Sequence, residues 1–344
     1  MSPTTTTILI SSLATGTIIT ASSHHWLMAW IGLEMNTLAI IPMISKQHHP
    51  RATEAATKYF LTQAAASALL LFASTMNAWY TGTWDITNLS SPTASTLFTM
   101  AVTMKLGLAP LHFWLPEVLQ GTTTKTAMII ATWQKLAPMA LIYLTHNNLS
   151  TPTLLTMGMI SALLGGWAGL NQTQARKIMA YSSIAHLGWM ATITTIMPNI
   201  LLLNLMIYLL MTTSMFYTLI LLNSKNIKDL ATSWTTSPTI STLTMLILLS
   251  LGGLPPLTGF MPKWLILEEL TTQNLTTVAT IMASSALLSL FFYLRLSYTS
   301  TITLSPNTTT TKHKWRFKQT TNTLLLTLTM PMSTLMLPMT PMLF

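Results

Sequence analysis

Long apolar segments constrain the fold of this sequence more than any other feature. A run of about 18 or more predominantly apolar residues is long enough to cross a bilayer as a helix. Only 7% of the residues are charged, whereas a soluble domain has about 25%. We predict an all-α polytopic membrane protein with about eleven transmembrane helices, and a count of ten or twelve stays open. The expected spans cover residues 3–21, 25–44, 58–80, 95–119, 125–145, 152–171, 177–197, 199–223, 238–269, 275–296 and 322–343.

The basic residues are distributed asymmetrically over the loops between these spans. When the N-terminus is placed on the positive side, the odd-numbered loops contain no lysine or arginine. Such an excess of positive charge marks the cytoplasmic side, which is the matrix side in a mitochondrion. We therefore expect the N-terminus in the matrix and the C-terminus in the intermembrane space. The loop cations are Lys46, Arg51, Lys58, Lys125, Arg176, Lys177, Lys225, Lys228, Arg295, Lys312, Lys314, Arg316 and Lys318.

The composition excludes several classes of function. The net charge of +9 is mostly a consequence of topology, so we expect contact with anionic lipids such as cardiolipin and no nucleic-acid binding. The chain has no cysteine and therefore supplies no thiolate ligand or disulfide. It has no phosphate loop, dinucleotide fingerprint or HExxH motif, and we expect no cofactor-binding or metal-binding residue in it. The N-terminal sequence resembles neither a secretory signal nor a transit peptide, so we expect no cleaved leader.

Four charged residues lie away from the ends of the expected spans, where charge is costly. They are Glu34, Lys105, Lys135 and Lys263. An ionisable residue at the centre of a membrane helix costs about 2.5–3.5 kcal/mol on insertion scales, so it is a functional candidate. At about 1.5 Å of rise per residue, the first three lie roughly 14–15 Å from the start of their spans. That depth corresponds to the bilayer midplane.

Two of the expected spans share a pattern of helix-breaking residues. The stretch "LGLAPLHFWLPEV" (residues 106–118) aligns with "GGLPPLTGFMPKW" (residues 252–264), so that Pro110 matches Pro256. These are the fourth and ninth spans, an odd number of spans apart, and the two copies must face opposite ways across the membrane. Paired interrupted spans in an inverted repeat indicate a transport pathway.

The prolines predict discontinuous helices at membrane depth. Each proline removes an amide donor and frees backbone polar groups that water or a polar side chain must satisfy. We therefore expect the breaks to admit water, with Lys105 before one break and Lys263 after the other. The alternative is that the prolines only kink the helices for packing, which leaves the buried lysines unexplained.

The buried charges suggest how a proton could be loaded and released. Burial favours the neutral form of lysine, and a nearby carboxylate favours the ammonium. Two unit charges about 4 Å apart interact by about 4 kcal/mol at an effective dielectric constant near 20. We predict that Glu34 modulates Lys105 and that Lys135 and Lys263 are successive proton carriers. The alternative for Glu34 and Lys105 is a static ion pair that neutralises two buried charges.

Two histidines are candidate relays on the same path. They are His112 in the first broken helix and His186 in "YSSIAHLGWM". Imidazole titrates near neutrality and can pass a proton between its two nitrogens, but a packing role stays open for each. Glu117, near the end of the fourth span, is expected to be a solvated carboxylate.

Six long stretches carry a specific resemblance that extends over nearly the whole chain. They are "WIGLEMNTLAIIPM" (30–43), "ATKYFLTQAAAS" (56–67), "MKLGLAPLHFWLPEV" (104–118), "WQKLAPM" (133–139), "GGWAGLNQTQARKIMAYSSIAHLGWM" (165–190) and "LSLGGLPPLTGFMPKW" (249–264). Together they resemble the chain 2 family of mitochondrial NADH:ubiquinone oxidoreductase, respiratory complex I, in its animal and more specifically vertebrate form.

This resemblance implies the fold of the antiporter-like membrane subunits, which is two inverted five-helix bundles with discontinuous helices. The bundles would be residues 1–148 and 149–300 of a single membrane domain (1–344), followed by a basic loop and a last transmembrane helix (301–344). The bacterial relatives have three additional N-terminal helices, so we expect other subunits to cover the first bundle. The family's buried proton-transfer residues match Glu34, Lys105, Lys135, Lys263 and His112.

The resemblance also implies a function. The chain would be a core membrane subunit of complex I in the mitochondrial inner membrane, contributing a proton channel coupled to electron transfer from NADH to ubiquinone. NADH, FMN, the iron–sulfur clusters and ubiquinone would be bound by other subunits, and the partners would be other membrane subunits, including further antiporter-like chains. Two alternatives stay open: a free-standing cation/proton antiporter, and a structural subunit without its own proton path.

Overall fold

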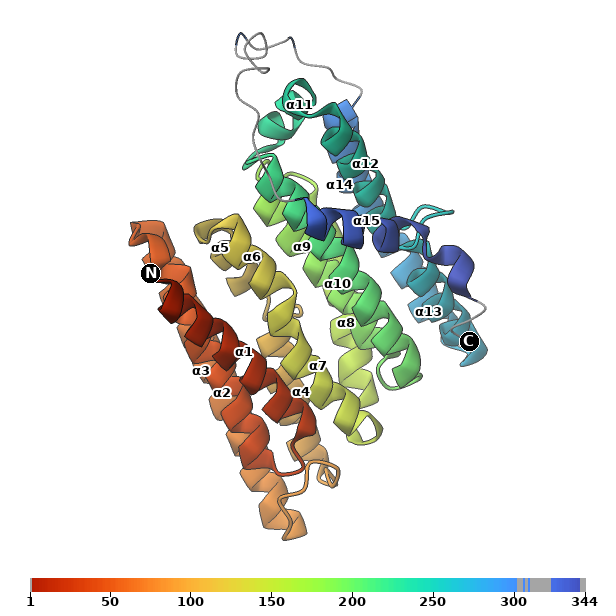
Figure 1. Cartoon of the computed structure of the whole chain (residues 1–344). Coiled ribbons are helices and arrows are strands. Elements are labelled where there is room, and N and C mark those ends of the chain that lie inside the picture. Colours follow the sequence, from red (N-terminus) through yellow and green to blue (C-terminus); the bar gives the residue numbers. More distant parts are fainter. Residues whose placement is uncertain (1, 302–305, 307–308, 310–322, 341–344) are drawn as a thin grey trace. The chain divides into compact units, whose positions relative to one another are not determined.

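The computed structural model describes residues 2–301, 306, 309 and 323–340, and this part of the chain is almost entirely helical. It divides into two compact units. The first unit contains residues 1–161 and 190–198, and the second contains residues 162–189 and 199–344. The units are described separately below, and their helices are labelled in Figure 1.

The first unit consists of seven complete α-helices, two short 3₁₀ turns, the beginning of an eighth helix and the last residues of a ninth. Its elements are α1 (Pro3–Ser22), α2 (Trp26–Ile44), η1 (Ser45–Gln47), α3 (Pro50–Thr81), α4 (Pro92–Leu106), α5 (Trp114–Gly121), α6 (Thr124–Ala131), α7 (Trp133–Thr145), η2 (His146–Asn148) and the start of α8 (Thr151–Gly169).

The second unit contains the remainder of α8 and the helices that follow it. These are most of α9 (Ala175–Ile193), then α10 (Pro198–Leu221), α11 (Ile227–Thr236), α12 (Pro238–Gly252), α13 (Phe260–Thr272), α14 (Thr276–Thr301), α15 (Leu324–Leu335) and the turn η4 (Leu337–Met339).

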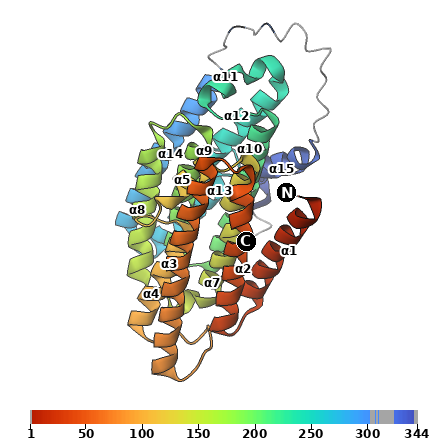
Figure 2. The same ribbon diagram turned by 90° about the vertical axis from the view of Figure 1, so that its left-hand side faces the viewer.

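Small residues set a close helix contact in the first unit, between α1 and α2. A methyl group at Gly16 would lie 2.9 Å from the carbonyl oxygen of Gly32, and one at Gly32 would lie 2.8 Å from the carbonyl oxygen of Gly16. The two backbones therefore touch directly, as small residues allow in membrane helix pairs. In the same unit α3 packs against α2, α4 and α5, and α7 packs against α1, α2 and α4. Figure 2 shows α1, α2 and α3 from a second direction.

Helix α3 begins at Pro50, earlier than the expected span at residue 58. Proline is favourable at the first helical position because its fixed φ suits the helix and its missing amide hydrogen would have no partner there. The ring nitrogen of His49 accepts from the amide of Arg51 at 3.2 Å and completes the cap. The alanine-rich residues that follow continue the helix, so Arg51 and Lys58 are helical and not loop residues.

Helix α11 lies where a loop was expected between residues 223 and 238. It begins with a capping box, in which Asn226 caps the helix and the carboxylate of Asp229 accepts from the amide of Asn226 at 2.9 Å. The spacing of these two residues is the sequence signature of a helix start. It was overlooked because the segment is too short and too polar to be a membrane span.

Six helices of the described part are long and apolar enough to cross a membrane. They are α1, α2, α3, the α6–α7 stretch Thr124–Asn148, α10 and α14. The other expected spans coincide with α8, α9, the interrupted pairs α4–α5 and α12–α13, and α15, which are shorter, interrupted or more polar. The chain is thus an all-helical, multi-pass protein, and the count of eleven spans stays a prediction.

The expected C-terminal segment is described only in part. Helix α15 has 12 residues, fewer than the ~20 needed to span a bilayer. The expected basic residues Lys312, Lys314, Arg316 and Lys318 lie outside the described residues. Arg295, expected in the loop before them, lies within α14 and donates hydrogen bonds to the carbonyls of Leu170 and Gln172 at the end of α8.

Three of the expected spans are interrupted. Helix α4 ends at Leu106 and α5 begins at Trp114, while α12 ends at Gly252 and α13 begins at Phe260. Both intervening segments contain a cis proline peptide, at Pro110 and at Pro256. The third interruption separates α6 from α7 at Thr132, and the sequence analysis did not predict it.

Candidate functional site

The break between α4 and α5 leaves the backbone carbonyl of Leu106 free to accept a hydrogen bond from a lysine. Helix α4 ends with Gly107 in the left-handed region at φ 81°, whose amide donates to the carbonyls of Thr103 and Met104. Glycine suits this position because it has no Cβ to oppose a positive φ. The carbonyl oxygen of Leu106 accepts a hydrogen bond from Nζ of Lys135, which lies in the first turn of α7. Lys135 is 1% exposed, so its ammonium is fully buried at the end of α4.

The second break has the same construction. Helix α12 ends with Gly253 at φ 78°, whose amide donates to the carbonyls of Leu249 and Ser250. The carbonyl oxygen of Gly252 accepts from Nζ of Lys263 at 2.8 Å. Lys263 is 8% exposed and lies in the first turn of α13.

The two lysines therefore donate to carbonyls at equivalent positions of the two breaks, although Lys135 lies on α7 and Lys263 on α13. In the alignment of the two proline patterns, Leu106 matches Gly252, but the residue that matches Lys263 is Glu117. Glu117 does not reach its break. It is 53% exposed and pairs with Lys58 at 2.6 Å, as a solvated carboxylate can. The first unit supplies its ammonium from α7 instead.

A helix end favours a positive charge at these carbonyls. The last carbonyls of a helix carry roughly half a negative charge in total, and they lack partners within the helix. A carbonyl accepts a hydrogen bond from an ammonium and from a neutral amine alike, because both carry N–H groups. Lys135 and Lys263 can thus keep their hydrogen bonds when they lose a proton.

Glu34 and Lys105 come together in the first unit, as the sequence analysis predicted. Oε1 of Glu34 lies 3.9 Å from Nζ of Lys105, with the side chain of Lys105 2% exposed and that of Glu34 23% exposed. This distance is within range of an ion pair but exceeds a hydrogen bond. The second carboxylate oxygen of Glu34 accepts from the hydroxyl of Thr37 at 3.2 Å. The pair is therefore close but not locked.

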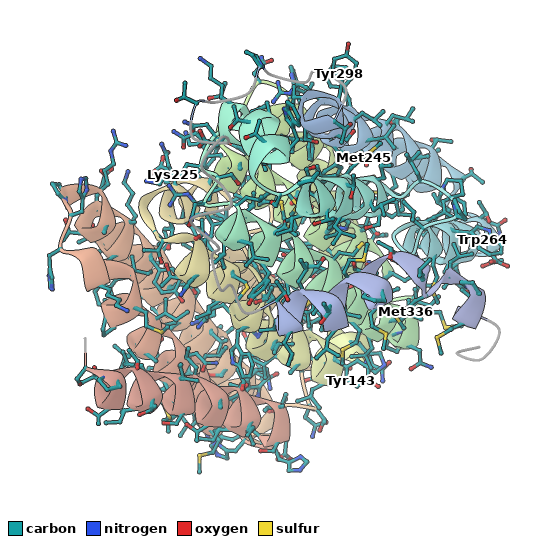
Figure 3. All side chains as sticks on the ribbon, turned by 45° about the horizontal axis from the view of Figure 1, so that its top comes forward. Tyr143, Lys225, Met245, Trp264, Tyr298 and Met336 are labelled. Atoms are coloured by element: carbon teal, nitrogen blue, oxygen red, sulfur yellow. The ribbon has the colours of Figure 1, made fainter. Side chains whose placement is uncertain are left out.

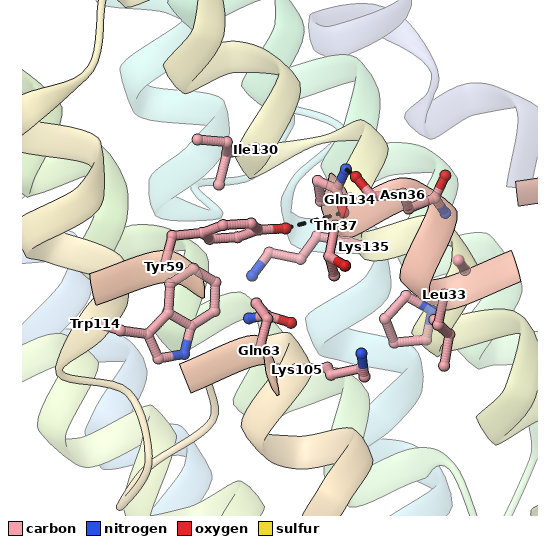
Figure 4. A pocket seen from close by; sticks show the side chains of 12 residues that line it. Leu33, Asn36, Thr37, Tyr59, Gln63, Lys105, Trp114, Ile130, Gln134 and Lys135 are labelled. Carbon is pink, nitrogen blue, oxygen red and sulfur yellow. Dashed lines mark hydrogen bonds between the residues drawn. The ribbon is translucent and has the colours of Figure 1, made fainter. Parts of the chain in front are cut away.

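A buried cavity joins the neighbourhoods of Lys105 and Lys135. Both lysines line it, together with Asn36, Gln63 and Gln134. Figure 4 shows these residues, with the amide of Asn36 turned away from Gln63 and Lys135. Two aromatic residues close one side of the cavity. They are Tyr59 and Trp114, whose rings meet edge to face with centroids 5.7 Å apart, and the same indole lies 5.7 Å from Nζ of Lys135.

The two candidate histidines are both buried but differ in their surroundings. His112 lies in the segment between α4 and α5, 5% exposed, and its Nδ1 has no hydrogen-bond partner among the described residues. His186 on α9 is 6% exposed and packs against the ring of Tyr208 at 5.7 Å. His186 and Lys263 belong to the second unit, whereas His112, Lys105 and Lys135 belong to the first.

The uncharged residues of the site were not among the predicted site residues. The amides of Asn36, Gln63 and Gln134 lie inside apolar spans, and that placement was the available signal. The lysines were selected instead, because a lysine costs more free energy to insert into a membrane than an amide does. The accepting carbonyls of Leu106 and Gly252 have no sequence signal, because every residue has a carbonyl.

No cluster of three or more histidine, aspartate and glutamate side chains that could hold a metal occurs within the residues described by the structure.

Comparison with known proteins agrees with this architecture. Residues 23–289 match the family described as NADH:quinone oxidoreductase/Mrp antiporter, transmembrane region, and residues 290–344 match NADH dehydrogenase subunit 2 C-terminus. NADH-ubiquinone oxidoreductase chain 2 of Xenopus laevis is 60% identical over 88% of this chain and 87% of its own length. That of Squalus acanthias is 56% identical over 100% of this chain and 99% of its own.

A solved structure has the same fold. A chain of respiratory complex I from Thermus thermophilus, solved with bound aureothin, superposes with a TM-score of 0.82 at 27% identity, over 97% of this chain and 79% of that one. Because the family matches cover residues 23–344 and close relatives match most of the chain, the resemblance is confirmed. The chain belongs to the NADH-ubiquinone oxidoreductase chain 2 family.

Proposed function

We propose that the buried lysines of this chain form a proton path that works as part of respiratory complex I. The chain is an antiporter-like membrane subunit of that complex. Its own residues supply no redox chemistry in this proposal, and electron transfer from NADH to ubiquinone takes place on other subunits that hold FMN and the iron–sulfur clusters. The chain contributes proton translocation across the inner membrane.

One observation carries this proposal. In each unit a buried ammonium donates to the carbonyl that a helix break leaves free, namely Lys135 to Leu106 and Lys263 to Gly252. The acceptor is neutral, so neither lysine is held in its charged form by a carboxylate. Each lysine can therefore gain or lose a proton at a modest cost in free energy. A lysine held by a carboxylate could not, because losing its proton would leave the carboxylate without its partner.

Glu34 has a separate role in this scheme. When it lies near Lys105 it favours the ammonium there, and when it moves away Lys105 favours release of its proton. The loose pairing at 3.9 Å supports such a switch. His112 and His186 are candidate relays for the lysines, since both are buried and imidazole can pass a proton between its nitrogens.

The remaining arrangement is inferred from charge and pattern. The bundles 1–148 and 149–300 are inverted repeats of five helices each within an eleven-span chain, the N-terminus lies in the matrix, and the C-terminus lies in the intermembrane space. Anionic lipids such as cardiolipin and the neighbouring antiporter-like subunits contact the outer surface. In Figure 3 exposed apolar side chains such as Trp264, 53% exposed, are available for such contacts.

Substitution of Lys135 tests the proposed function. We expect Lys135→Met in the assembled complex to reduce the number of protons translocated per NADH oxidised, because methionine has a similar length but no proton to carry. Lys125→Met is the matched control, since Lys125 is exposed on α6 in the same interrupted span. An unchanged ratio for Lys135→Met would favour the structural subunit. Cation/proton exchange by the purified chain alone in liposomes would favour the free-standing antiporter.

A further inference from the structure

A buried tryptophan connects the two halves of the first broken span. Trp114 is the first residue of α5, the helix that resumes this span, and it is 6% exposed. Its indole Nε1 donates a hydrogen bond to the carbonyl oxygen of Met104 at 3.2 Å. Met104 lies in the last turn of α4. A buried indole N–H requires a partner, so this bond fixes the orientation of the ring relative to the end of α4.

The residues around the indole leave little freedom to its ring. A methyl group at Gly107 would lie 3.3 Å from Cζ2 of Trp114, which is tighter than an ordinary contact, so the glycine that ends α4 also leaves room for the indole. The ring of Tyr59, 1% exposed, meets the indole edge to face with centroids 5.7 Å apart. The hydrogen bond, the glycine and the second aromatic ring together fix the position of Trp114 in this packed interior.

The face of this ring lies beside a buried cation. Nζ of Lys135 lies over the indole, 5.7 Å from the ring centroid, and Figure 4 shows the side chain of Lys135 extending toward Trp114 and Tyr59. An ammonium within about 6 Å of a ring centroid is attracted by the negative face of the ring, most strongly by tryptophan and where water is excluded. A neutral amine lacks this attraction. The contact therefore favours the charged form of Lys135, whereas the carbonyl of Leu106 accepts from either form.

The second break has a ring at the matching position but a different arrangement. Phe260 matches Trp114 in the alignment of the two proline patterns, and its side chain has no N–H with which to bind a helix end. Lys263 follows Phe260 on the same helix, α13. In the first unit the ring lies on α5 and the lysine on α7. The indole thus brings the resumed helix into contact with a lysine from another helix.

We propose that Trp114 is a positioning residue for Lys135, whose ring holds the ammonium beside the end of α4 and extends the pH range over which this lysine keeps its proton. The hydrogen bond to Met104 orients the ring, and the face of the ring stabilises the cation. The indole itself neither gains nor loses a proton in this role. This inference rests on the proposed function of Lys135.

Other ionisable groups lie on the elements around Lys135 and titrate in the same complex. They are Glu34 on α2, Tyr59 on α3, Lys105 on α4, Lys125 on α6 and His146 on η2. Tyr59 and Lys105 line the same cavity as Lys135, and Glu34 lies 3.9 Å from Lys105. All of these groups are retained when only Trp114 is substituted. A difference in pH dependence between two substitutions of Trp114 therefore reports on the ring.

Two substitutions of Trp114 in the assembled complex test this role. Trp114→Leu removes both the aromatic face and the N–H, whereas Trp114→Phe keeps a ring that attracts a cation less strongly than indole does. We measure the protons translocated per NADH oxidised as a function of pH, with assembly checked by native gel. On the alkaline side, we expect the ratio of Trp114→Leu to fall about one pH unit earlier than that of the unaltered complex. Trp114→Phe should show a smaller shift in the same direction.

A second tryptophan provides the matched control. Trp26 on α2 is 1% exposed and packs edge to face on Phe98 at 5.1 Å, but it does not line the cavity. Trp26→Leu should therefore lower thermal stability without moving the pH profile. If Trp114→Leu lowers the ratio equally at every pH and Trp114→Phe does not restore it, the ring is only structural and the inference is wrong. If Trp114→Leu fails to assemble, Trp114→Phe decides, and an unshifted profile overturns the inference.

The outcomes distinguish this inference from the proposed function. If Lys135→Met lowers the ratio while both variants of Trp114 follow the pH profile of the unaltered complex, the role of the ring is wrong and the proton path stands. If Lys135→Met leaves the ratio unchanged at every pH, the proposed function is wrong and this inference fails with it.

Discussion

At the scale of single residues, the acceptor of each ammonium decides what the lysine can do. Lys135 and Lys263 face neutral carbonyls, and Lys105 faces the carboxylate of Glu34. A carboxylate at 3.9 Å and an effective dielectric constant near 20 favours the ammonium by about 4 kcal/mol. The three buried lysines are therefore not interchangeable, and only Lys105 has a partner whose movement changes its charge.

Glu34→Gln tests that distinction. Glutamine has the same shape without the charge, so we expect Lys105 to lose its bias toward the ammonium and the protons translocated per NADH to fall, with assembly intact. The measurement is the proton ratio in membrane vesicles, with assembly checked by native gel. Glu54→Gln is the matched control, because Glu54 is an exposed glutamate that pairs with Lys58 at the surface. Normal translocation by Glu34→Gln would establish the static ion pair.

At the scale of elements, the two broken helices depend on glycines with positive φ. Gly253 lies at φ 78°, and a methyl group there would also lie 2.9 Å from Nζ of Lys263. Gly82 ends α3 at φ 70°, with no atom within 4 Å of the position a methyl group would take. Both glycines lie in the left-handed region, and their surroundings differ.

This difference gives a paired prediction. Gly253→Ala and Gly82→Ala should each cost roughly 1–2 kcal/mol, the penalty of a left-handed residue with a Cβ. Only Gly253→Ala should also displace Lys263 and lower the proton ratio. Thermal inactivation and proton translocation of the two assembled variants are the measurements. Equal proton ratios would show that Lys263 does not need its present position.

Helix α15 is fastened to the second break. The hydroxyl of Thr258, between α12 and α13, donates to the carbonyl of Ser333, and both residues are fully buried. Thr258→Val has nearly the same shape but leaves that carbonyl without a partner, so we expect a loss of about 1–3 kcal/mol. Thr258→Ser should retain most of the stability. Thermal inactivation of the two variants measures the difference, and equal midpoints would show that the contact is not needed.

The elements also show how far the sequence could be interpreted. The segments around prolines 110 and 256 correctly predicted broken helices, because each combines proline with a glycine that can end a helix. The position of Lys135 beside Leu106 could not be predicted, because it depends on how α7 packs against α4. The break at Thr132 was missed for a similar reason, since no proline or glycine marks it. Helix α11 was predictable from its capping box and was overlooked.

At the scale of the whole molecule, the orientation in the membrane can be tested cleanly. The chain contains no cysteine, so an introduced cysteine carries its only thiol. Lys225, labelled in Figure 3, is exposed in an even-numbered loop, and Asp85 is exposed in an odd-numbered loop. We expect a membrane-impermeant maleimide to label Lys225→Cys only from the matrix side and Asp85→Cys only from the intermembrane side. The mass of the isolated chain measures the labelling, and labelling of both from one side would overturn the topology.

The family and the membrane class were predictable for the whole molecule, because apolar spans and long motifs leave few alternatives. The number of spans was harder to predict. Helices α8 and α9 and the interrupted pairs α4–α5 and α12–α13 contain polar residues or breaks, so length and composition alone do not identify them as membrane spans. Polar residues in these helices do not indicate exposure to solvent. Ser182 and Ser183 on α9, for example, are both fully buried.

The paired carbonyls at Leu106 and Gly252 have a consequence for how such a protein can change over time. A main-chain oxygen is present whatever side chain the codon specifies, and here the two positions already differ, one being leucine and the other glycine. No point substitution can remove the accepting carbonyl oxygen. A substitution can only remove the lysine that donates to it or change the course of the backbone. The donor can therefore come from a different helix in each case, as it does here, while the hydrogen bond to the end of the broken helix stays the same.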